Sequence, residues 1–242
     1  MIKTTIHTTP SSFDSLYFKL REREGRIYSD SEVQKLPEVH SSHKHYKEWL
    51  IRKNSSDRLI NYLLKKKQRL NILEIGSGNG WLSAKLSEIP GSTVMGVEIN
   101  SFEFEQASRV FKEYTNLEFS EKFPDTTDMA ENKFDIIVFA AAIQYFSSFQ
   151  EIINKSLKIL NAKGEIHILD SHFYEGTLIH LAKQRSFNYF KSIEFSEMTD
   201  QYFHHNKNEY EKYNYRMLYS PNWFQRFLPG IKNPFPWICI YK

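Results

Sequence analysis

The sequence predicts a doubly wound α/β fold built on a mostly parallel sheet, and two observations carry that prediction. Apolar runs typical of buried strands alternate with segments of helical period throughout residues 71–170. In the first strand–helix unit, an apolar run breaks into glycines at Gly76, Gly78 and Gly80 and then resumes as a helical pattern. Alternating strands and helices favour parallel strands joined by right-handed crossovers, and a glycine-rich turn at a strand end is typical of nucleotide-binding folds.

Each element is predicted from its local pattern. Apolar runs predict strands at residues 71–75, 92–100, 117–119, 134–140, 165–170, 213–219 and 235–241. Helical periods predict helices at residues 45–52, 57–64, 81–89, 104–111, 149–160 and 174–190. Ser55, Ser56 and Asp57 offer amino-cap chemistry for the second of these helices. Residues 161–164 predict a turn, and residues 123–133 predict a polar loop.

Composition and charge narrow the class of protein. The 242 residues are 40% hydrophobic and 25% charged, which suits one α/β domain with appendages. The net charge is only +3, and the cationic run 65–67 falls at a predicted helix end that favours cations, so nucleic-acid binding is not expected. The single Cys239 cannot form an intramolecular disulfide or a thiolate zinc cluster. Residues 1–10 lack a signal-peptide core and no apolar run reaches the roughly 18 to 20 residues of a membrane span, so a cytoplasmic protein without membrane contact is expected.

Two appendages flank the alternating section. Residues 1–56 are polar, match a helical period only from His45, and are expected to form an N-terminal helical cap before a main domain at residues 57–242. Aromatic residues make up 15% of the chain and many follow Tyr174, so residues from about 174 to 227 are expected to form a cap or pocket. Tyr46, Trp49 and Arg52 share one helix face that could close over a ligand or pack on the core, and packing is favoured.

The glycine cluster predicts a binding site for a nucleoside. Its spacing, Glu74-x-Gly76-x-Gly78-x-Gly80, is tighter than the G-x-G-x-x-G dinucleotide fingerprint. Glu98 follows Gly76 by 22 positions at the end of the next strand, where a carboxylate can accept hydrogen bonds from both hydroxyls of a ribose. Alone, the glycine cluster could be an ordinary strand-to-helix turn, and Glu98 could be a solvated acid at a strand end. Together, the two features favour a nucleoside-binding site.

Over residues 71–170 the sequence resembles the class I S-adenosylmethionine-dependent methyltransferases. Residues 72–80 look like their first motif, 97–99 like their acidic ribose motif, 134–138 like their fourth strand and 157–170 like the segment that follows. The resemblance implies a seven-stranded, Rossmann-like sheet whose last strand is antiparallel, and it implies S-adenosylmethionine as cofactor with S-adenosylhomocysteine as product. The cofactor-binding residues that it implies are Glu74, Gly76, Ser77, Gly78, Gly80, Glu98, Ile99, Ala140 and Ala141.

The sequence departs from this family in two places. An acidic residue that meets the adenine amine could only be Glu121 or Asp125, and neither lies in a clear motif. Many members have a histidine after the fourth strand, where this chain has Gln144 and Tyr145. Tyr145 and His172 are the candidate catalytic residues, because both follow strand ends and a histidine can take a proton at neutral pH. For His172, a loop histidine without chemical role is the alternative.

These features predict methyl transfer to an oxygen, nitrogen or carbon atom of a small or medium-sized acceptor. No metal site is expected, since no histidine pair has ligand spacing with a carboxylate on one helix face. The alternatives are a non-catalytic S-adenosylmethionine-binding module, an RNA methyltransferase, and an NAD-dependent dehydrogenase that the glycine spacing disfavours. A homo-oligomer is possible, and the acceptor is not identified by the sequence.

Overall fold

The computed structural model of the chain describes residues 12–124, 134–221 and 233–242. The strands of its main sheet are β1 (Asn71–Ile75), β2 (Thr93–Val97), β3 (Leu117–Ser120), β4 (Phe134–Ala140), β5 (Leu160–Leu169), β8 (Tyr215–Tyr219) and β9 (Trp237–Tyr241). They lie in the order β3-β2-β1-β4-β5-β9-β8. The first five pair in parallel, and β9 runs antiparallel to both β5 and β8. This confirms the predicted seven-stranded, mostly parallel, Rossmann-like sheet with an antiparallel last strand.

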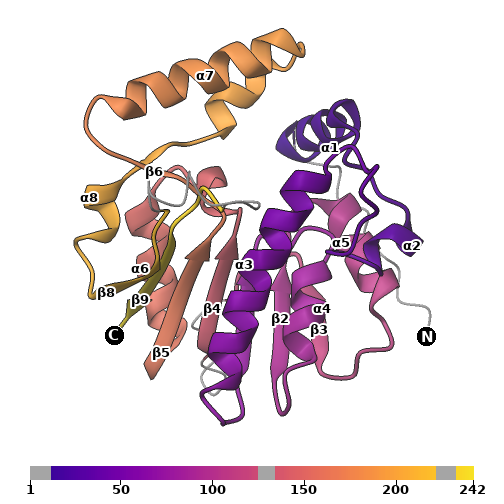
Figure 1. Cartoon of the computed structure of the whole chain (residues 1–242), viewed down its shortest axis with the longest axis vertical. Coiled ribbons are helices and arrows are strands. Elements are labelled where there is room, and N and C mark those ends of the chain that lie inside the picture. The colour runs from indigo at the N-terminus through magenta and orange to yellow at the C-terminus, as the bar shows by residue number, and fades with distance from the viewer. Residues whose placement is uncertain (1–11, 125–133, 222–232) are drawn as a thin grey trace.

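Helices cover both faces of the sheet. The helices are α1 (Ser12–Glu24), α2 (Asp30–Val33), α3 (Tyr46–Leu64), α4 (Trp81–Ser87), α5 (Ser101–Val110), α6 (Phe149–Ile159), α7 (Leu178–Ser192) and α8 (Lys207–Tyr210), with 3-10 turns η1 (Ile143–Tyr145) and η2 (Ser196–Gln201). Figure 1 shows α3, α4 and α5 on one face and α6 on the other. Side chains alternate between these layers along each strand, so Ile72 packs in the α3 and α4 layer whereas Leu73 packs in the α6 layer.

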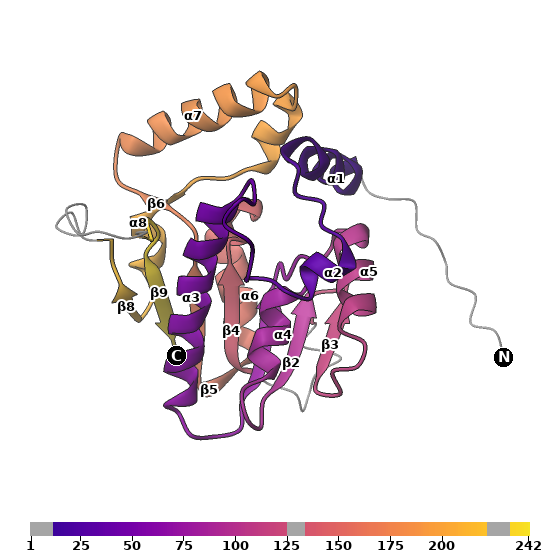
Figure 2. The same ribbon diagram turned by 45° about the vertical axis from the view of Figure 1, so that its right-hand side comes forward.

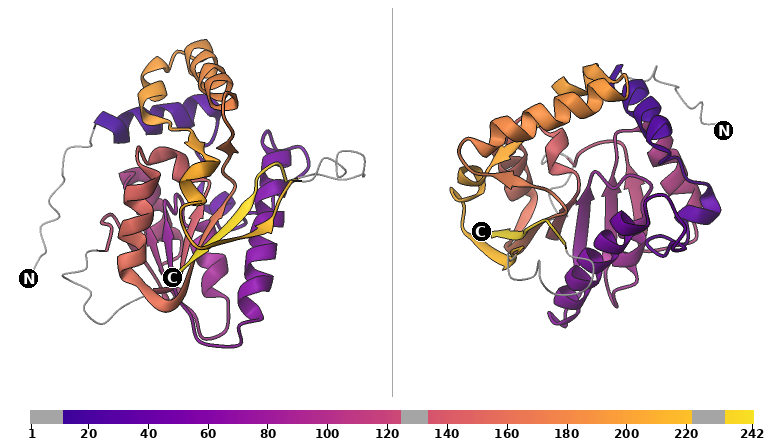
Figure 3. Two further views of the ribbon diagram at one scale, coloured as in Figure 1. Left: turned by 90° about the vertical axis from the view of Figure 1, so that its left-hand side faces the viewer. Right: turned by 45° about the horizontal axis from the view of Figure 1, so that its top comes forward.

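Two further helices lie above the carboxyl edge of the sheet. Figures 1 and 2 show α1 and α7 there, and the right view of Figure 3 shows strand ends between them. A third hydrophobic cluster joins these helices, with Leu20 of α1 against Phe190 of α7 and Met198 of η2. The short parallel pair β6 (Phe173–Tyr174) and β7 (His205–Asn206) connects this cap to the sheet. Part of the predicted aromatic segment, residues 222–227, lies outside the described residues.

The N-terminal part differs from its prediction in two ways. The first difference is the helix α1, which lies wholly before His45, where no helix was predicted. Its apolar side chains Phe13, Leu16 and Leu20 do recur at helical spacing, so the sequence holds a pattern that could have predicted this helix. The predicted helix start at residues 55–57 is wrong, because α3 runs unbroken from Tyr46 to Leu64. The Ser56 hydroxyl instead donates to the Lys53 carbonyl one turn back, and the Ser55 hydroxyl lies 3.1 Å from the Ile51 carbonyl and 2.6 Å from the Asp170 carboxylate. The proposed division after residue 56 falls inside this helix.

The predicted turn at residues 161–164 is also wrong, because these residues belong to β5. The pairing of β4 with β5 jumps from Phe134 opposite Leu160 to Ile136 opposite Glu165. The turn-forming sequence therefore produces an irregularity within a strand rather than a break before it. Among the described residues, no helix combines the length and the hydropathy that a bilayer span needs.

Candidate active site

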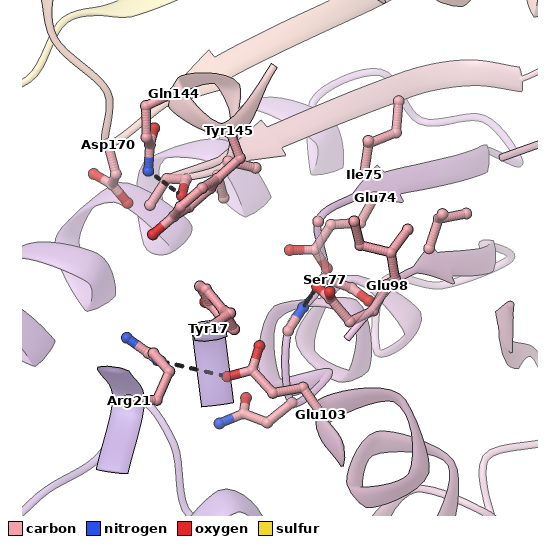
Figure 4. Close-up of a pocket in the computed structure, with 18 of the residues that line it drawn as sticks. Tyr17, Arg21, Glu74, Ile75, Ser77, Glu98, Glu103, Gln144, Tyr145 and Asp170 are labelled. Carbon is pink, nitrogen blue, oxygen red and sulfur yellow. Dashed lines mark hydrogen bonds and ion pairs between the residues drawn. The ribbon is translucent and has the colours of Figure 1, made fainter. Parts of the chain in front are cut away.

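A cavity of about 450 Å³ lies at the carboxyl ends of β1, β2, β4 and β5. Its walls come from the glycine turn after β1, the ends of the other three strands, α1 above and the amino-terminal half of α3. Figure 4 shows Glu74, Ser77 and Glu98 on one side and Tyr145, Asp170 and Gln144 on the other. The carboxyl edge of a parallel sheet is where α/β folds bind ligands, so this cavity is the candidate active site.

The glycine turn brings backbone close to the cavity. Gly76, Gly78 and Gly80 all have positive φ, at 73°, 55° and 80°. Gly76 and Gly78 line the cavity, whereas a side chain at Gly80 would meet Phe119 at 2.6 Å. The structure therefore brings Gly76 and Gly78 to the predicted cofactor position, and it places Gly80 in helix–strand packing beneath the turn.

Two buried polar atoms of the turn have unused hydrogen-bonding capacity. Ser77 and Asn79 both line the cavity. Within the described residues, neither the Ser77 hydroxyl nor the Asn79 side-chain oxygen has a hydrogen-bond partner. Such groups are rare in native structures because an unmet buried polar atom is costly. Their position beside Gly78 fits a polar ligand that lies against the turn.

Glu98 is held at the end of β2 with its carboxylate at the cavity wall. Its two oxygens accept the backbone amides of Gly78 and Asn100, each at 2.8 Å. Burial, followed by repulsion from Glu103, raises the pKa of Glu98 to about 7. The next residue, Ile99, also lines the cavity and is 64% exposed, which leaves an apolar surface free for a ligand.

Glu74 lies beneath the turn and also reaches the cavity. The Ser83 hydroxyl of α4 donates to its carboxylate at 2.5 Å, which ties β1 to the helix that follows the glycines. Burial raises the pKa of Glu74 to about 8, although the Ser83 bond acts in the other direction. Two carboxyl groups with raised pKa in one cavity are typical of a functional site.

The ends of β4 and β5 hold strained backbone. Ala141 and Asp170 have φ values of 53° and 52°, which non-glycine residues rarely adopt. The Ala141 amide donates to the carbonyl of Leu169, and the Ser55 hydroxyl donates to the Asp170 carboxylate at 2.6 Å. Ala140, Ala141 and Asp170 all line the cavity. Strain of this kind collects at functional sites, where the surrounding structure fixes it.

The two candidate catalytic residues lie in different places. Tyr145 lines the cavity and packs edge-on against Tyr17 and Tyr202, with ring centroids 5.6 and 5.8 Å apart. Burial raises the pKa of Tyr145. His172 does not line the cavity; it is exposed, and its ring lies 4.5 Å from that of Phe235. Of the two, the structure therefore brings only Tyr145 to the predicted cofactor-binding residues.

Several cavity residues were not predicted. Tyr17 and Arg21 come from α1, and Glu103 comes from the first turn of α5. Trp49 and Arg52 of α3 also line the cavity, although packing on the core was the favoured role for their helix face. The helical spacing of apolar residues in α1 could have indicated a helix, but no local pattern indicates that this helix lies over the glycine turn much later in the chain. Asp125, one candidate for the adenine amine, lies outside the described residues, and Glu121 does not line the cavity.

One buried cluster elsewhere could suggest a metal. Glu165, His167 and Cys239 bring ligand atoms within 4.8 Å of one another where β5 pairs with β9. Trp237 donates its indole N–H to His167 Nδ1, so Nε2 carries the proton and has no lone pair for a metal. Glu165 is already bound by Lys66 at 2.8 Å. These donors do not fit a metal ion.

The comparisons with known proteins agree with this geometry. Residues 66–220 match a family model described as a methyltransferase domain. The chain is 25% identical over 99 residues to a demethylmenaquinone methyltransferase of Chlorobaculum parvum, a match that covers 41% of this chain and 40% of that protein. It is 31% identical over 131 residues to a malonyl-[acyl-carrier protein] O-methyltransferase of Priestia megaterium, covering 52% of this chain and 46% of that one. Each match therefore spans less than half of the curated relative.

Solved structures extend the likeness of fold to almost the whole chain. A magnesium protoporphyrin IX methyltransferase from Synechocystis PCC 6803, solved with S-adenosylhomocysteine, superposes with a TM-score of 0.57 at 13% identity, covering 95% of this chain and 96% of that one. A plantazolicin methyltransferase gives a TM-score of 0.57 at 15% identity, covering 96% of this chain and 95% of that one. Since the methyltransferase model matches more than half of its residues, the chain belongs to the class I S-adenosylmethionine-dependent methyltransferases.

Proposed function

We propose that the protein transfers the methyl group of S-adenosylmethionine to a small or medium-sized acceptor. The observation that carries this proposal is the pair of polar atoms without a hydrogen-bond partner among the described residues on Ser77 and Asn79. These residues flank Gly78, whose amide donates to the Glu98 carboxylate, and all of them line the cavity. An added Cβ at Gly78 would stand 3.2 Å from the Glu103 carboxylate, and the φ of Gly78 is 55°, so glycine suits this position of the turn.

Six of the nine predicted cofactor residues have a proposed task. Glu98 holds the ribose hydroxyls, Ile99 offers its exposed apolar surface to the adenine, and Gly76 and Gly78 let the ligand approach the backbone. Ala140 and Ala141 border the amino-acid part of the cofactor. The bound cofactor supplies an electrophilic methyl group on a sulfonium ion, so the protein mainly aligns the acceptor and excludes water.

The acceptor side is formed by α1, η1 and the cap. Tyr17 and Tyr145 present aromatic surface, and Gln201 of η2 reaches the same cavity. Because burial raises the pKa of Tyr145, its phenol stays protonated at neutral pH and can orient an acceptor rather than take its proton. We assign the described part of the predicted aromatic cap, residues 174–221, and the N-terminal cap to this acceptor side.

The relatives support a small-molecule acceptor. Curated relatives of part of the chain are named for methylation of demethylmenaquinone and of malonyl-acyl carrier protein. Structures of similar fold include a geranyl diphosphate C-methyltransferase. The net charge of +3 is small for an RNA-binding enzyme, which keeps RNA methylation the weaker alternative.

Calorimetric titration of S-adenosylmethionine and of S-adenosylhomocysteine tests the cofactor assignment. We expect saturable heat for the wild-type protein and at least tenfold weaker binding for Glu98→Ala and Gly78→Arg. Glu105→Ala is the matched control, because Glu105 lies on α5 and is exposed. Equal binding in all four proteins would overturn the site. Binding without release of S-adenosylhomocysteine across a broad acceptor panel would instead favour a non-catalytic binding module.

A further inference from the structure

Among the described residues, three arginines line the cavity, and two of them bind one carboxylate of the protein. Arg26 binds Glu48 with both terminal nitrogens, at 2.8 and 2.6 Å, and Arg52 binds the same carboxylate through Nε at 3.1 Å. Although burial opposes it, these two cations hold the pKa of Glu48 at about 2. The guanidinium groups of Arg26 and Arg52 therefore already have an anionic partner within the protein.

Arg21 is different. Its Nε is buried, and among the described residues it has no hydrogen-bond partner. The Glu103 carboxylate lies 3.6 Å from this Nε, and the Glu24 carboxylate lies 4.0 Å from Nη1; both distances are in ion-pair range but too long for a hydrogen bond. A buried charged donor without an acceptor is costly, so Arg21 retains hydrogen-bonding capacity that a ligand can use.

The surroundings of Arg21 indicate what kind of ligand fits. Its guanidinium lies 5.7 Å from the Tyr17 ring, and the Tyr17 ring meets that of Tyr145. Figure 4 shows Arg21 and Tyr145 across the cavity from Ser77 and Glu74. The fork of an arginine matches a carboxylate with two parallel bonds, and neighbouring aromatic rings favour an apolar body beside that carboxylate.

We propose that Arg21 binds a carboxylate of the methyl acceptor. This inference rests on the proposed function and adds the acceptor's chemical class: a carboxylic acid with an aromatic or aliphatic body that lies against Tyr17 and Tyr145. Arg21 would select acceptors that carry a carboxylate, because it holds that end of the acceptor while the cofactor lies against the glycine turn. The amino-acid carboxylate of the cofactor is the other possible source of the same chemistry, and the two sources are separable.

The test begins with the cofactor arm. S-adenosylhomocysteine and its decarboxylated analogue are titrated into the wild-type protein, Arg21→Gln and Arg23→Gln. Arg23 lies on the same helix with a side chain 57% exposed, so it is the matched control. We expect Arg21→Gln to bind both nucleosides as the wild type does. Weaker binding of S-adenosylhomocysteine alone would give the carboxylate to the cofactor and overturn the acceptor assignment. No binding to the wild-type protein would instead refute the proposed function.

The acceptor arm uses the complex with S-adenosylhomocysteine. Benzoate and hexanoate are titrated into it beside benzamide and hexanamide, which have the same shape without the charge. We expect the wild type and Arg23→Gln to bind an acid about tenfold or more tightly than its amide, and Arg21→Gln to lose that preference. Arg21→Lys keeps the charge without the fork and is expected to retain part of it. Wild-type protein without a preference for the acids, or Arg21→Gln with an unchanged preference, would overturn the proposal.

Discussion

The carboxylate of Glu98 accepts the backbone amide of Gly78 at 2.8 Å, so the end of β2 is tied directly to the glycine turn after β1. Two features that the sequence places 20 residues apart thus form one wall of the cavity. The bond also fixes the carboxylate before any ligand arrives, which lowers the ordering cost of binding.

The first prediction concerns the pH dependence of cofactor binding. The pKa of Glu98 is about 7 because of burial and Glu103, so its carboxylate fraction grows as the pH rises from 6 to 8. The charged form is the better acceptor for ribose hydroxyls. Affinity for S-adenosylmethionine should therefore increase over this range in calorimetric titrations. Glu98→Gln should bind more weakly with a flatter profile, and an equally steep profile in that variant would contradict the assignment.

The second prediction concerns stability in the absence of ligand. Burial raises the pKa of Glu74 to about 8, above its value in an unfolded chain. Between about pH 4.5 and 8 the folded state holds a proton that the unfolded state has lost, so this carboxyl lowers the free energy of unfolding by up to ~1.4 kcal/mol per pH unit as the pH rises. In urea unfolding at several pH values, the free energy of unfolding of Glu74→Gln should fall less steeply with pH than that of the wild type. Glu118→Gln, at an exposed site on β3, should show the same pH dependence as the wild type.

The third prediction separates strain from packing at glycines. Gly80→Ala places a methyl group 2.6 Å from Phe119 and 2.8 Å from Ala107 at a φ of 80°. Gly176→Ala has a φ of 43° and meets nothing within 4 Å. We expect a loss of about 2–4 kcal/mol for the first and about 1 kcal/mol for the second in urea unfolding. Equal losses of stability in the two variants would mean that the backbone around residue 80 moves to make room for the methyl group, which would contradict the packing argument.

The fourth prediction concerns proton transfer. Removal of a general base slows catalysis by about 10²–10⁴-fold. Tyr145 has a raised pKa and His172 lies outside the cavity lining, so neither is placed as a base. Once an acceptor is known, Tyr145→Phe and His172→Ala should each keep kcat within about tenfold of the wild type. Tyr145→Ala, which removes the ring, should raise KM. A hundredfold loss of kcat in His172→Ala would restore the catalytic role expected from the sequence.

The fifth prediction concerns the attachment of α1. Asp14 accepts bonds from the Asn100 side chain at 2.5 Å and from the Ser101 hydroxyl at 2.7 Å, at the start of α5. Asp14→Ala should loosen α1 and speed the dissociation of S-adenosylhomocysteine about tenfold in stopped-flow measurements. Asp57→Ala, at an exposed site on α3, should leave the rate unchanged. Identical rates would mean that α1 does not close the cofactor side.

The parts of the site that could be predicted from the sequence are those formed by residues close together along the chain. The strand, glycine turn and helix at residues 71–87 form one continuous pattern, and Glu98 ends the next strand, so local periodicity was sufficient. Ser55 shows the limit: its hydroxyl looks like a helix cap, yet it lies in mid-helix and donates to the carboxylate of Asp170, 115 residues away. Arg21 shows it again, since only the folded chain brings α1 against α5.

The helix α1 is fastened at both ends to different halves of the molecule. Asp14 holds its beginning on α5, close to the proposed ribose-binding carboxylate of Glu98, whereas Glu24 at its end accepts the hydroxyl of Tyr189 on α7 at 2.5 Å. Because α1 lines the cavity, both contacts must break before the whole helix can lift away from it. The main domain and the cap therefore hold this wall of the cavity in place together.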